Sequence, residues 1–278
     1  MTQFADFPGD SPAAPASFGA RAGRVALVGA GPGDPELLTV KGYLALKAAD
    51  VVLFDDLVSP EIIELLPAGA RCIYVGKPYQ SAGISQADII TQLIAAARGG
   101  NRVVRLKGGD PMVFGRSGEE LEGLRAAGVA VDVIPGITAA TGAAASTRIT
   151  LTHRDYAAQV SFVTAAKKDG NLADVRGLAG AGKTLVVYMG IARADALSAA
   201  FIADGVAPHW PIAIVENATR ANERVIITTV AGLSQAIARD VVRSPALFIV
   251  GEVVKTYTPV AVTAAEDAQH GCRVGDAQ

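Results

Sequence analysis

The chain has no large excess of charge and no long apolar run. Its 25 Lys and Arg residues nearly balance its 27 Asp and Glu residues, so no global field attracts nucleic acid or an anionic membrane surface. The longest stretch without these four residue types, 133–147, contains Pro135 and Gly136 and is too short to cross a bilayer. We therefore expect no nucleic-acid partner and no membrane partner, and an anionic ligand must meet local basic residues.

Cysteine is nearly absent, since only Cys72 and Cys272 occur. Two isolated cysteines form no disulfide framework, so the composition is typical of the reducing cytoplasm. The start of the chain places Asp6 and Asp10 before any basic residue and lacks the basic and apolar parts of a signal peptide. It predicts a disordered leader over residues 1–22.

What the chain does contain is an alternation of short apolar runs with helical patterns. Strand-like runs occur at 25–28, 51–54, 72–75, 103–106 and 129–134, with helical patterns over 35–49, 61–66, 86–97 and 118–127. This βα alternation predicts a largely parallel five-stranded sheet. The small-residue segment 138–146 then predicts a packed helix.

The second half has a different order of elements. Strand-like runs occur at 160–164, 185–188, 212–215, 225–230 and 247–250, with helical patterns over 194–203 and 233–238. The short polar turn before residue 225 predicts a hairpin, and hence a mixed sheet. We therefore expect two α/β domains, 23–147 and 148–258, followed by a flexible tail over 259–278.

Residues 29–35, Gly-Ala-Gly-Pro-Gly-Asp-Pro, follow the first strand directly. A dinucleotide fingerprint would need a glycine at position 34, but Asp34 stands there, before Pro35. This pair predicts a helix N-cap whose carboxylate occupies the place of a pyrophosphate. The loop is either a plain strand-to-helix turn or a ligand loop at the carboxyl end of a strand.

Residues 177–184, Gly-Leu-Ala-Gly-Ala-Gly-Lys-Thr, match the phosphate-binding P-loop pattern. A P-loop leaves a strand and opens a helix, whereas here a short helical stretch is expected before the motif and a strand directly after it. We interpret the segment as a glycine-rich helix exit.

Two further glycine loops follow predicted strands. Residues 105–111 read Arg-Leu-Lys-Gly-Gly-Asp-Pro with Arg116 shortly after, and residues 135–139 read Pro-Gly-Ile-Thr-Ala. Glycines there permit close backbone approach to a ligand, and Arg116 is suited to pair with a carboxylate. Three such loops at one sheet edge predict a ligand site.

Metal and triad chemistry find no support in the sequence. The histidines 153, 209 and 270 are isolated, Cys72 has no neighbouring cysteine, and no Gly-x-Ser-x-Gly elbow occurs. We expect no metal cofactor.

Five segments within residues 24–254 resemble one family. They are 28–35, 105–111, 135–139, 151–154 (Leu-Thr-His-Arg) and 244–247 (Ser-Pro-Ala-Leu). Together they are similar to the uroporphyrinogen-III C-methyltransferases of the tetrapyrrole methylase family. The resemblance implies two α/β domains with an active-site cleft between them, and a homodimer.

The implied reaction is transfer of methyl groups from S-adenosylmethionine to ring carbons C-2 and C-7 of uroporphyrinogen III. The product would be precorrin-2, which feeds sirohaem, cobalamin or haem d1 synthesis. In-line transfer from a sulfonium depends chiefly on alignment and water exclusion.

The resemblance also assigns residues. It implies that S-adenosylmethionine contacts Pro32, Gly108, Gly109, Asp110, Val113, Thr138, Ala139, Met189 and Ala218. It implies catalytic roles at the substrate for Asp55, Arg116 and Arg154, with Met189 also facing the substrate. Arginines would orient a polycarboxylate macrocycle, and Asp55 is a candidate acceptor for the proton that leaves.

Some segments depart from the family's usual pattern, and other functions stay open. The departures are Phe54, residues 78–79 and residues 148–150, which bear on porphyrinogen docking. One rival is a methyltransferase of the same fold that acts on a later corrinoid precursor. Another is a non-catalytic regulator that binds S-adenosylmethionine and needs neither Arg116 nor Arg154. An ATPase rests only on residues 177–184.

Overall fold

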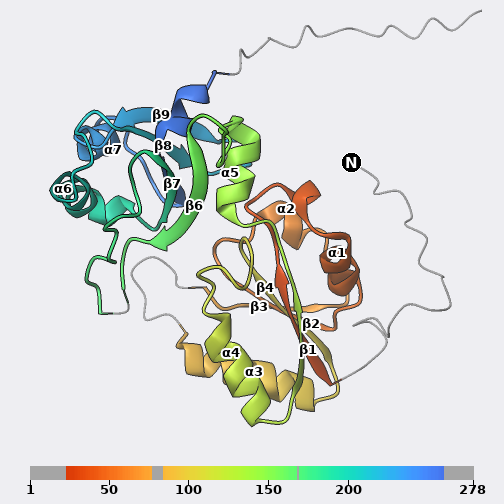
Figure 1. Cartoon of the computed structure of the whole chain (residues 1–278). Helices are drawn as coiled ribbons and strands as arrows, with labels where there is room; N and C mark the ends of the chain where they lie inside the picture. Colours follow the sequence, from red (N-terminus) through yellow and green to blue (C-terminus); the bar gives the residue numbers. More distant parts are fainter. Residues whose placement is uncertain (1–22, 77–83, 168, 260–278) are drawn as a thin grey trace, which may run out of the picture.

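The computed structural model describes residues 23–76, 84–167 and 169–259. The predicted leader, the tail beyond residue 259 and the departure at residues 78–79 lie outside these ranges. The described chain forms two five-stranded sheets, each with its own helices (Figure 1).

The first sheet has the strand order β3-β2-β4-β1-β5, and its strand pairs are all parallel. Its strands are β1 (Arg24–Gly29), β2 (Val51–Phe54), β3 (Arg71–Tyr74), β4 (Arg102–Lys107) and β5 (Ala130–Ile134). Strands β1 and β4 are buried along almost their whole length, as expected for parallel strands with helices on both faces. The predicted parallel five-stranded sheet is confirmed.

Helices cover both faces of this sheet. Their bounds are α1 (Val40–Lys47), α2 (Pro60–Ile63), α3 (Gln86–Arg98) and α4 (Ser117–Ala126). Side chains of α1 and α2 share one buried cluster with the sheet, and side chains of α3 and α4 share another on the opposite face. The chain therefore forms the layered α/β arrangement that the alternating pattern predicts.

The prediction of a single helix over 35–49 is wrong, because the segment forms a 3-10 turn followed by a separate α-helix. Asp34 accepts a hydrogen bond from the Glu36 N–H and begins a 3-10 turn, η2 (Pro35–Leu37), as the predicted N-cap. Leu38 then takes an extended conformation, and the Thr39 side chain caps α1 by accepting from the Gly42 N–H.

The second sheet has the order β6-β7-β10-β8-β9. Its strands are β6 (Ala157–Thr164), β7 (Gly182–Tyr188), β8 (Pro211–Glu216), β9 (Arg224–Thr229) and β10 (Ala246–Val250). Strands β6 and β7 pair in parallel, and the other pairs are antiparallel. The predicted mixed sheet and its β8–β9 hairpin are confirmed.

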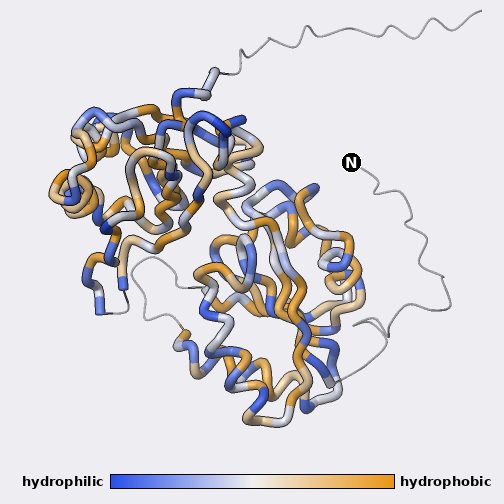
Figure 2. The backbone as a smooth tube through the Cα atoms, viewed as in Figure 1, coloured by the Kyte–Doolittle hydropathy of each residue, from blue (hydrophilic) through white to orange (hydrophobic). Residues whose placement is uncertain are grey.

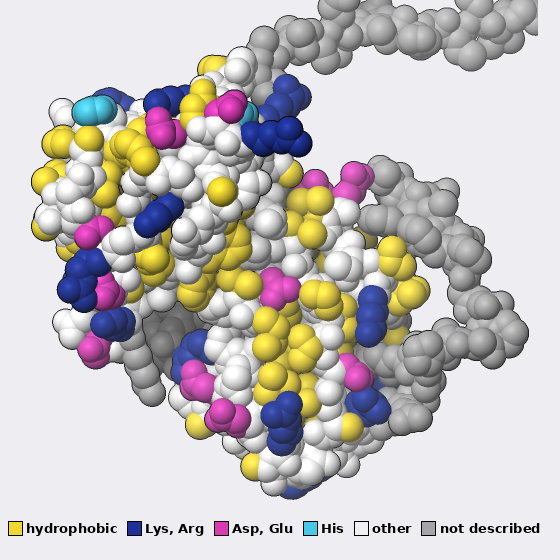
Figure 3. Space-filling model, in the orientation of Figure 1, with side chains coloured by type: hydrophobic (Ala, Val, Ile, Leu, Met, Phe, Trp, Pro, Cys, Tyr) yellow, Lys and Arg dark blue, Asp and Glu magenta, His cyan; other side chains and the backbone are white. Residues whose placement is uncertain are grey.

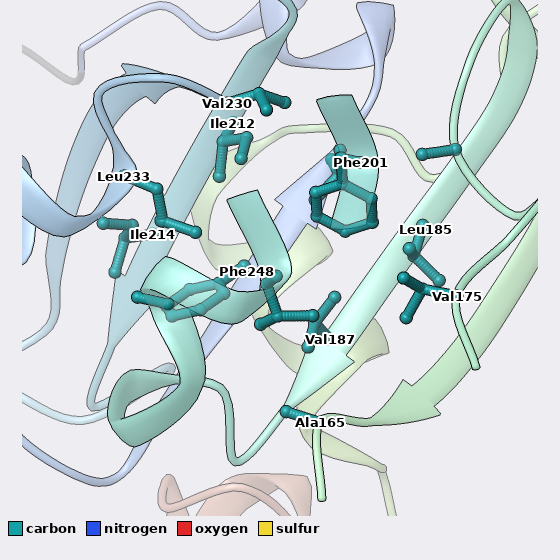
Figure 4. Close-up of a cluster of buried hydrophobic side chains, with 14 of the residues drawn as sticks. Ala165, Val175, Leu185, Val187, Phe201, Ile212, Ile214, Val230, Leu233 and Phe248 are labelled. Carbon is teal, nitrogen blue, oxygen red and sulfur yellow. The ribbon is translucent and has the colours of Figure 1, made fainter. Parts of the chain in front are cut away.

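The second sheet also has two covered faces. Helices α6 (Ala194–Ala203) and α7 (Leu233–Arg239) enclose a core around Phe201 and Phe248 (Figure 4). The 3-10 turn η3 (Ile191–Arg193) leads into α6.

The other face of this sheet packs against α5 (Ala139–Thr147) and the 3-10 turn η4 (Glu252–Thr256). Ala140 and Ala143 of α5 are fully buried in the same cluster as Val186 and Val215 of the sheet. Helix α5 thus packs with the second half, although it lies within the first predicted domain, 23–147. The domain boundary itself stays a prediction.

The distribution of polarity follows these layers. Hydrophobic segments run along the strands of both sheets (Figure 2), and basic and acidic side chains are interspersed over the visible face (Figure 3). Among the described residues, no helix is both long and apolar enough to span a membrane.

Three loops meet at the carboxyl ends of β1, β4 and β5 through glycine backbones. Gly31 and Gly109 exchange two backbone hydrogen bonds, of 3.1 and 2.7 Å. A Cβ atom on Gly136 would lie 2.3 Å from the Gly109 carbonyl oxygen and 2.8 Å from Gly29 Cα. These glycines therefore permit close approach of backbone to backbone, and not only of backbone to ligand.

Substitution of Gly136 by alanine is expected to destabilise the fold, because the new Cβ atom would overlap the backbone at Gly29 and Gly109. We expect the free energy of unfolding to fall by about 1–3 kcal/mol or more in urea titrations. Gly118, exposed near the start of α4 with no atom within 4 Å of the position that a Cβ would take, is the matched control. Gly118→Ala should be neutral or stabilising by up to about 1 kcal/mol, and equal losses in both variants would contradict the packing explanation.

Candidate active site

A cavity of about 380 Å³ lies between the loop end of the first sheet and the second sheet. The loops after β1, β2, β4 and β5 form one wall, and the segments after β7 and β8 and before β10 form the other. Ligands of parallel α/β sheets bind beyond the carboxyl ends of the strands, and this volume is typical of a small-molecule site. The glycine loops singled out from the sequence do lie together here.

The cavity brings together most of the residues that the family resemblance assigned. Those expected to contact S-adenosylmethionine all line it, namely Pro32, Gly108, Gly109, Asp110, Val113, Thr138, Ala139, Met189 and Ala218. Asp55 and Arg116, assigned to the substrate, line it as well. Segments from distant parts of the sequence thus share one chamber.

Arg154 does not join them, as it is absent from the cavity lining. It is exposed in the turn that precedes β6, whereas the cavity lies near Tyr188, which pairs with the last residue of β6. The eight residues of β6 separate the two places by about 25 Å of extended strand. Within one chain, the structure therefore places Arg154 away from this chamber.

Asp110 joins two of the glycine loops. Its Oδ1 atom accepts a hydrogen bond of 2.7 Å from the Met112 N–H, and its Oδ2 atom accepts one of 3.0 Å from the Gly136 N–H. Hydrogen bonds to an ionised acceptor are stronger than neutral ones. The carboxylate therefore stabilises the loop after β4 and ties it to the loop after β5.

A network of buried charges supports the cavity floor. Arg105 and Lys107 of β4 are 4% exposed, and Glu120 of α4 is fully buried. Glu120 accepts from Arg105 Nε at 3.2 Å and from Lys107 Nζ at 2.9 Å. Gln86 Nε2 also donates to Glu120, at 3.0 Å. Burial lowers the pKa of Lys107, the charge of Arg105 lowers it further, and Glu120 opposes the shift.

The network ends at Asp55. Arg105 Nη2 donates to Asp55 Oδ2 at 2.9 Å, while the other oxygen, Oδ1, accepts from the Leu57 N–H at 3.3 Å. The Asp55 side chain is 23% exposed. The carboxylate is thus oriented from behind by a buried guanidinium and reaches the cavity.

Arg116 already pairs with a carboxylate of its own chain. Its Nε and Nη2 atoms each donate to Glu119, at 2.8 Å, in a bidentate pair. This hydrogen bonding raises the pKa of Arg116. About half of each side chain is exposed, so solvent screens the pair. A carboxylate that binds to these donors must compete with Glu119.

Tyr188, at the end of β7, connects the second sheet to the glycine loop before α5. Its hydroxyl lies 2.7 Å from Thr138 Oγ1 and accepts from the Ala140 N–H at 2.9 Å. It therefore satisfies a free N–H in the first turn of α5, where Thr138 makes no side-chain cap. Phe114 packs against the Tyr188 ring at 4.9 Å between centroids, and burial raises the pKa of Tyr188.

Unusual backbone conformations gather at this chamber. Phe114, Arg116 and Met189 all line it with φ between 54° and 56°. Asn217 and Thr219, on either side of the lining residue Ala218, have φ of 52° and 67°. Non-glycine residues at positive φ cost free energy and cluster at functional sites.

The P-loop-like motif has a structural explanation outside the chamber. Residues 176–178 form a turn and not the expected helical stretch, and β7 begins within the P-loop-like segment at Gly182. Lys183 Nζ donates to the Gly177 carbonyl, so the segment presents no helix N-terminus to a phosphate.

Among residues 23–76, 84–167 and 169–259, no group of three or more His, Cys, Asp or Glu side chains is arranged to hold a metal.

Comparison with known proteins identifies the family to which this chain belongs. The sequence profile of the Tetrapyrrole (Corrin/Porphyrin) Methylases matches residues 24–234. The chain belongs to this family. The α/β fold and the family resemblance predicted from the sequence are thereby confirmed.

Curated relatives of this tetrapyrrole methylase include siroheme synthases. That of Chromobacterium violaceum is 50% identical over 236 residues, and that of Hydrogenovibrio crunogenus is 47% identical over 234 residues. Each alignment covers 84% of this chain but 50% of the relative. The chain thus spans about half the length of the curated relatives it matches.

Solved structures agree with the family assignment. The uroporphyrin-III C-methyl transferase of Thermus thermophilus, complexed with S-adenyl homocysteine, is 42% identical with a TM-score of 0.74. That match covers 84% of this tetrapyrrole methylase and 100% of the Thermus chain. A cobalt precorrin-4 methyltransferase is 28% identical, also with a TM-score of 0.74, and the match covers 88% of this chain and 99% of that one.

Several residues of this methylase's site were missed from the sequence. They are Arg105, Lys107, Glu120 and Tyr188. One signal was available, since two basic residues two positions apart in a buried strand lie on one face and require a partner from the covering helix. Nothing in the sequence pointed to Tyr188, because its partners lie some 50 residues earlier in the chain.

Replacement of Glu120 by glutamine should strongly destabilise the methylase, because it leaves Arg105 and Lys107 buried with less compensating charge. We expect a loss of about 3–5 kcal/mol in the free energy of unfolding. Glu122, exposed on the same helix, is the control, and Glu122→Gln should change stability by less than about 0.5 kcal/mol. If Glu120→Gln is equally silent in denaturant titrations, the buried network does not support the fold.

Loss of the Asp110 carboxylate should loosen the junction of two loops. Asp110→Ala leaves the Met112 and Gly136 N–H groups without their charged acceptor, and we expect a loss of about 1.5–3 kcal/mol in urea unfolding. Asp110→Asn retains one acceptor oxygen and should lose less. A fully stable alanine variant would show that the two hydrogen bonds do not hold the loops.

Proposed function

We propose that this chain transfers methyl groups from S-adenosylmethionine to two ring carbons of uroporphyrinogen III, C-2 and C-7, giving precorrin-2. The supporting observation is that every residue assigned to S-adenosylmethionine lines one cavity. Further support is the similarity to a methyltransferase complexed with S-adenyl homocysteine, matched over its full length. The proposal concerns this chain alone, since the siroheme synthases are about twice as long as the matched region.

The chemistry of the cavity suits S-adenosylmethionine. Gly109 has a φ of 69° and no atom closer than 3.8 Å to the position of a Cβ, so its backbone is open to a ligand. Val113, Met189 and Leu247 offer apolar surface for an adenosine group. When bound, the sulfonium supplies the methyl group, and the surrounding residues align it and exclude water.

Asp55 is the proposed acceptor of the proton that leaves the substrate. It reaches the cavity as a carboxylate oriented by Arg105 and by the Leu57 N–H. A general base must lie at a fixed position within hydrogen-bond reach of the proton. The buried network behind Asp55 supports this assignment by supplying that rigidity.

Arg116 is proposed to orient a carboxylate of the macrocycle. Its planar guanidinium suits bidentate binding of a carboxylate, as its pair with Glu119 shows, and it lines the cavity. The proposal for Arg154 has no support from this cavity, so a role at the substrate would need a different route to it.

The finer expectations about assembly and location are also proposals. We propose a cytoplasmic homodimer with no nucleic-acid or membrane partner, supported by the near balance of charge and by the family resemblance. Light scattering during size-exclusion chromatography measures the oligomeric state, and a monomer would contradict the proposal.

One alternative reaction has a specific observation in its favour. The similarity to a cobalt precorrin-4 methyltransferase supports a later corrinoid precursor as the methyl acceptor. The fold accommodates both reactions, so substrate assays must separate them.

The proposed function is tested by incubating the purified chain with uroporphyrinogen III and S-adenosylmethionine and following the product mass. We expect addition of two methyl groups and formation of S-adenosylhomocysteine. Binding of S-adenosylhomocysteine without any methylation of uroporphyrinogen III would favour a regulator or a later corrinoid substrate. ATP binding that is lost in Lys183→Ala would favour the P-loop interpretation instead.

Replacement of Arg116 by lysine keeps the charge but removes the planar fork. We expect kcat/KM for uroporphyrinogen III to fall by roughly tenfold or more, while the Kd for S-adenosylhomocysteine stays unchanged. Arg154→Lys is measured in parallel. An equal loss in Arg154→Lys would support its predicted substrate role despite its distance from the cavity, and full activity in Arg116→Lys would contradict the role of Arg116.

A further inference from the structure

Arg220 projects from the second half of the chain across the rim of the cavity. It lies in the turn between β8 and β9 and lines the cavity. Its Nη2 atom donates to the Leu57 carbonyl at 2.9 Å, in the loop after β2. Its stem lies over Gly33, where a Cβ would come within 2.4 Å of Arg220 Cγ. The side chain therefore contacts two loops of the first half.

The turn that carries Arg220 is held firmly from several sides. Glu223 Oε2 accepts from the Thr219 N–H at 2.7 Å and from Ser146 Oγ at 2.5 Å. Thr219 Oγ1 in turn accepts from the Asp34 N–H at 3.2 Å. These bonds maintain Thr219 at a φ of 67° and fix the place from which Arg220 reaches the cavity.

Arg220 differs from the other basic residues of the lining in having no carboxylate within 4 Å among the described residues. Arg105, Lys107 and Arg116 each form a salt bridge with an acid of the same half. Its own backbone N–H and Ser59 lower the pKa of Glu61 most, and Glu61 lies close enough for the charge of Arg220 to lower that pKa further. Within the described chain, Glu61 forms no salt bridge with Arg220.

The guanidinium also has donors to spare. It carries five N–H groups, and one hydrogen bond to protein, that of Nη2, is made within the described chain. Its Nε atom is buried with no partner there. A charged donor without a partner costs free energy, and Nη donors of this partly exposed, cavity-lining side chain remain for an anion.

We propose that Arg220 binds a carboxylate of the tetrapyrrole substrate at the cavity rim. This inference rests on the proposed function and extends it with a position that the family motifs did not assign. Leu57, which Arg220 contacts, is two residues from Asp55, the proposed proton acceptor. A carboxylate held by Arg220 therefore places the edge of the macrocycle on the Asp55 side of the chamber. S-adenosylmethionine also carries a carboxylate, so the experiment measures both ligands.

The experiment compares Arg220→Met, which removes the charge at similar length, with Arg220→Lys, which keeps a cation. Arg239→Met is the matched control, because Arg239 is exposed at the end of α7 and pairs with Asp240. For each variant of the 278-residue chain, KM and kcat are measured with uroporphyrinogen III, and the Kd of S-adenosylhomocysteine is measured by calorimetry. Thermal unfolding verifies that each variant folds.

We expect Arg220→Met to raise KM for uroporphyrinogen III by about tenfold or more and to leave the Kd of S-adenosylhomocysteine within twofold. Arg220→Lys should recover part of this loss, and added salt should raise KM more for the wild type than for Arg220→Met.

An unchanged KM in folded Arg220→Met would overturn the inference. So would a weaker Kd for S-adenosylhomocysteine with an unchanged KM, since the carboxylate would then belong to the methyl donor. Failure of the wild type to methylate uroporphyrinogen III would instead reject the proposed function, which separates the two tests.

Discussion

Direct contact between glycine backbones at the ends of β1, β4 and β5 determines how the chamber is built. Gly29 and Gly136 lie so close to each other and to the Gly109 carbonyl oxygen that neither position has room for a Cβ atom. The three loops can therefore cross one another and still hydrogen-bond, as Gly31 and Gly109 do. Asp110 adds a charged link between two of these loops. The glycines are thus needed first so that the loops can pack against one another. The loops packed in this way then leave backbone surface open to a ligand.

Behind this wall, the structure keeps ionised groups inside a parallel sheet. Removing Arg105, Lys107 and Glu120 from water is costly, and their mutual contacts largely offset that cost. Burying these charges orients the Asp55 carboxylate, because Arg105 donates to it from a fixed position. Apolar residues at the same places would fill the volume without orienting a carboxylate in the cavity. We interpret the buried charges as a means of rigid positioning.

The sequence predicted the architecture well, because buried parallel strands and amphipathic helices have distinct periods. It failed where short polar contacts override periodicity, as at Asp34 and Thr39, which divide the predicted helix over 35–49 into two pieces. For the site, motifs that follow a strand directly were sufficient to indicate one chamber. Glu120 and Tyr188 were out of reach, because their roles arise from contacts between segments distant in the chain. Arg154 shows the opposite error of prediction: a residue in a family motif can lie away from the chamber of its own chain.

The packing of α5 has a mechanical consequence. Helix α5 shares its core with the second sheet and is bonded at its first turn to Tyr188. The described chain therefore passes between its two halves once, through residues 135–138, and each half is continuous in sequence. Away from that connection, the side chain of Arg220 links the halves again through its hydrogen bond to the Leu57 carbonyl. The two walls of the chamber are thus joined by one connection of the chain and, beyond it, by noncovalent contacts such as Asp34 N–H to Thr219 and Arg220 to Leu57.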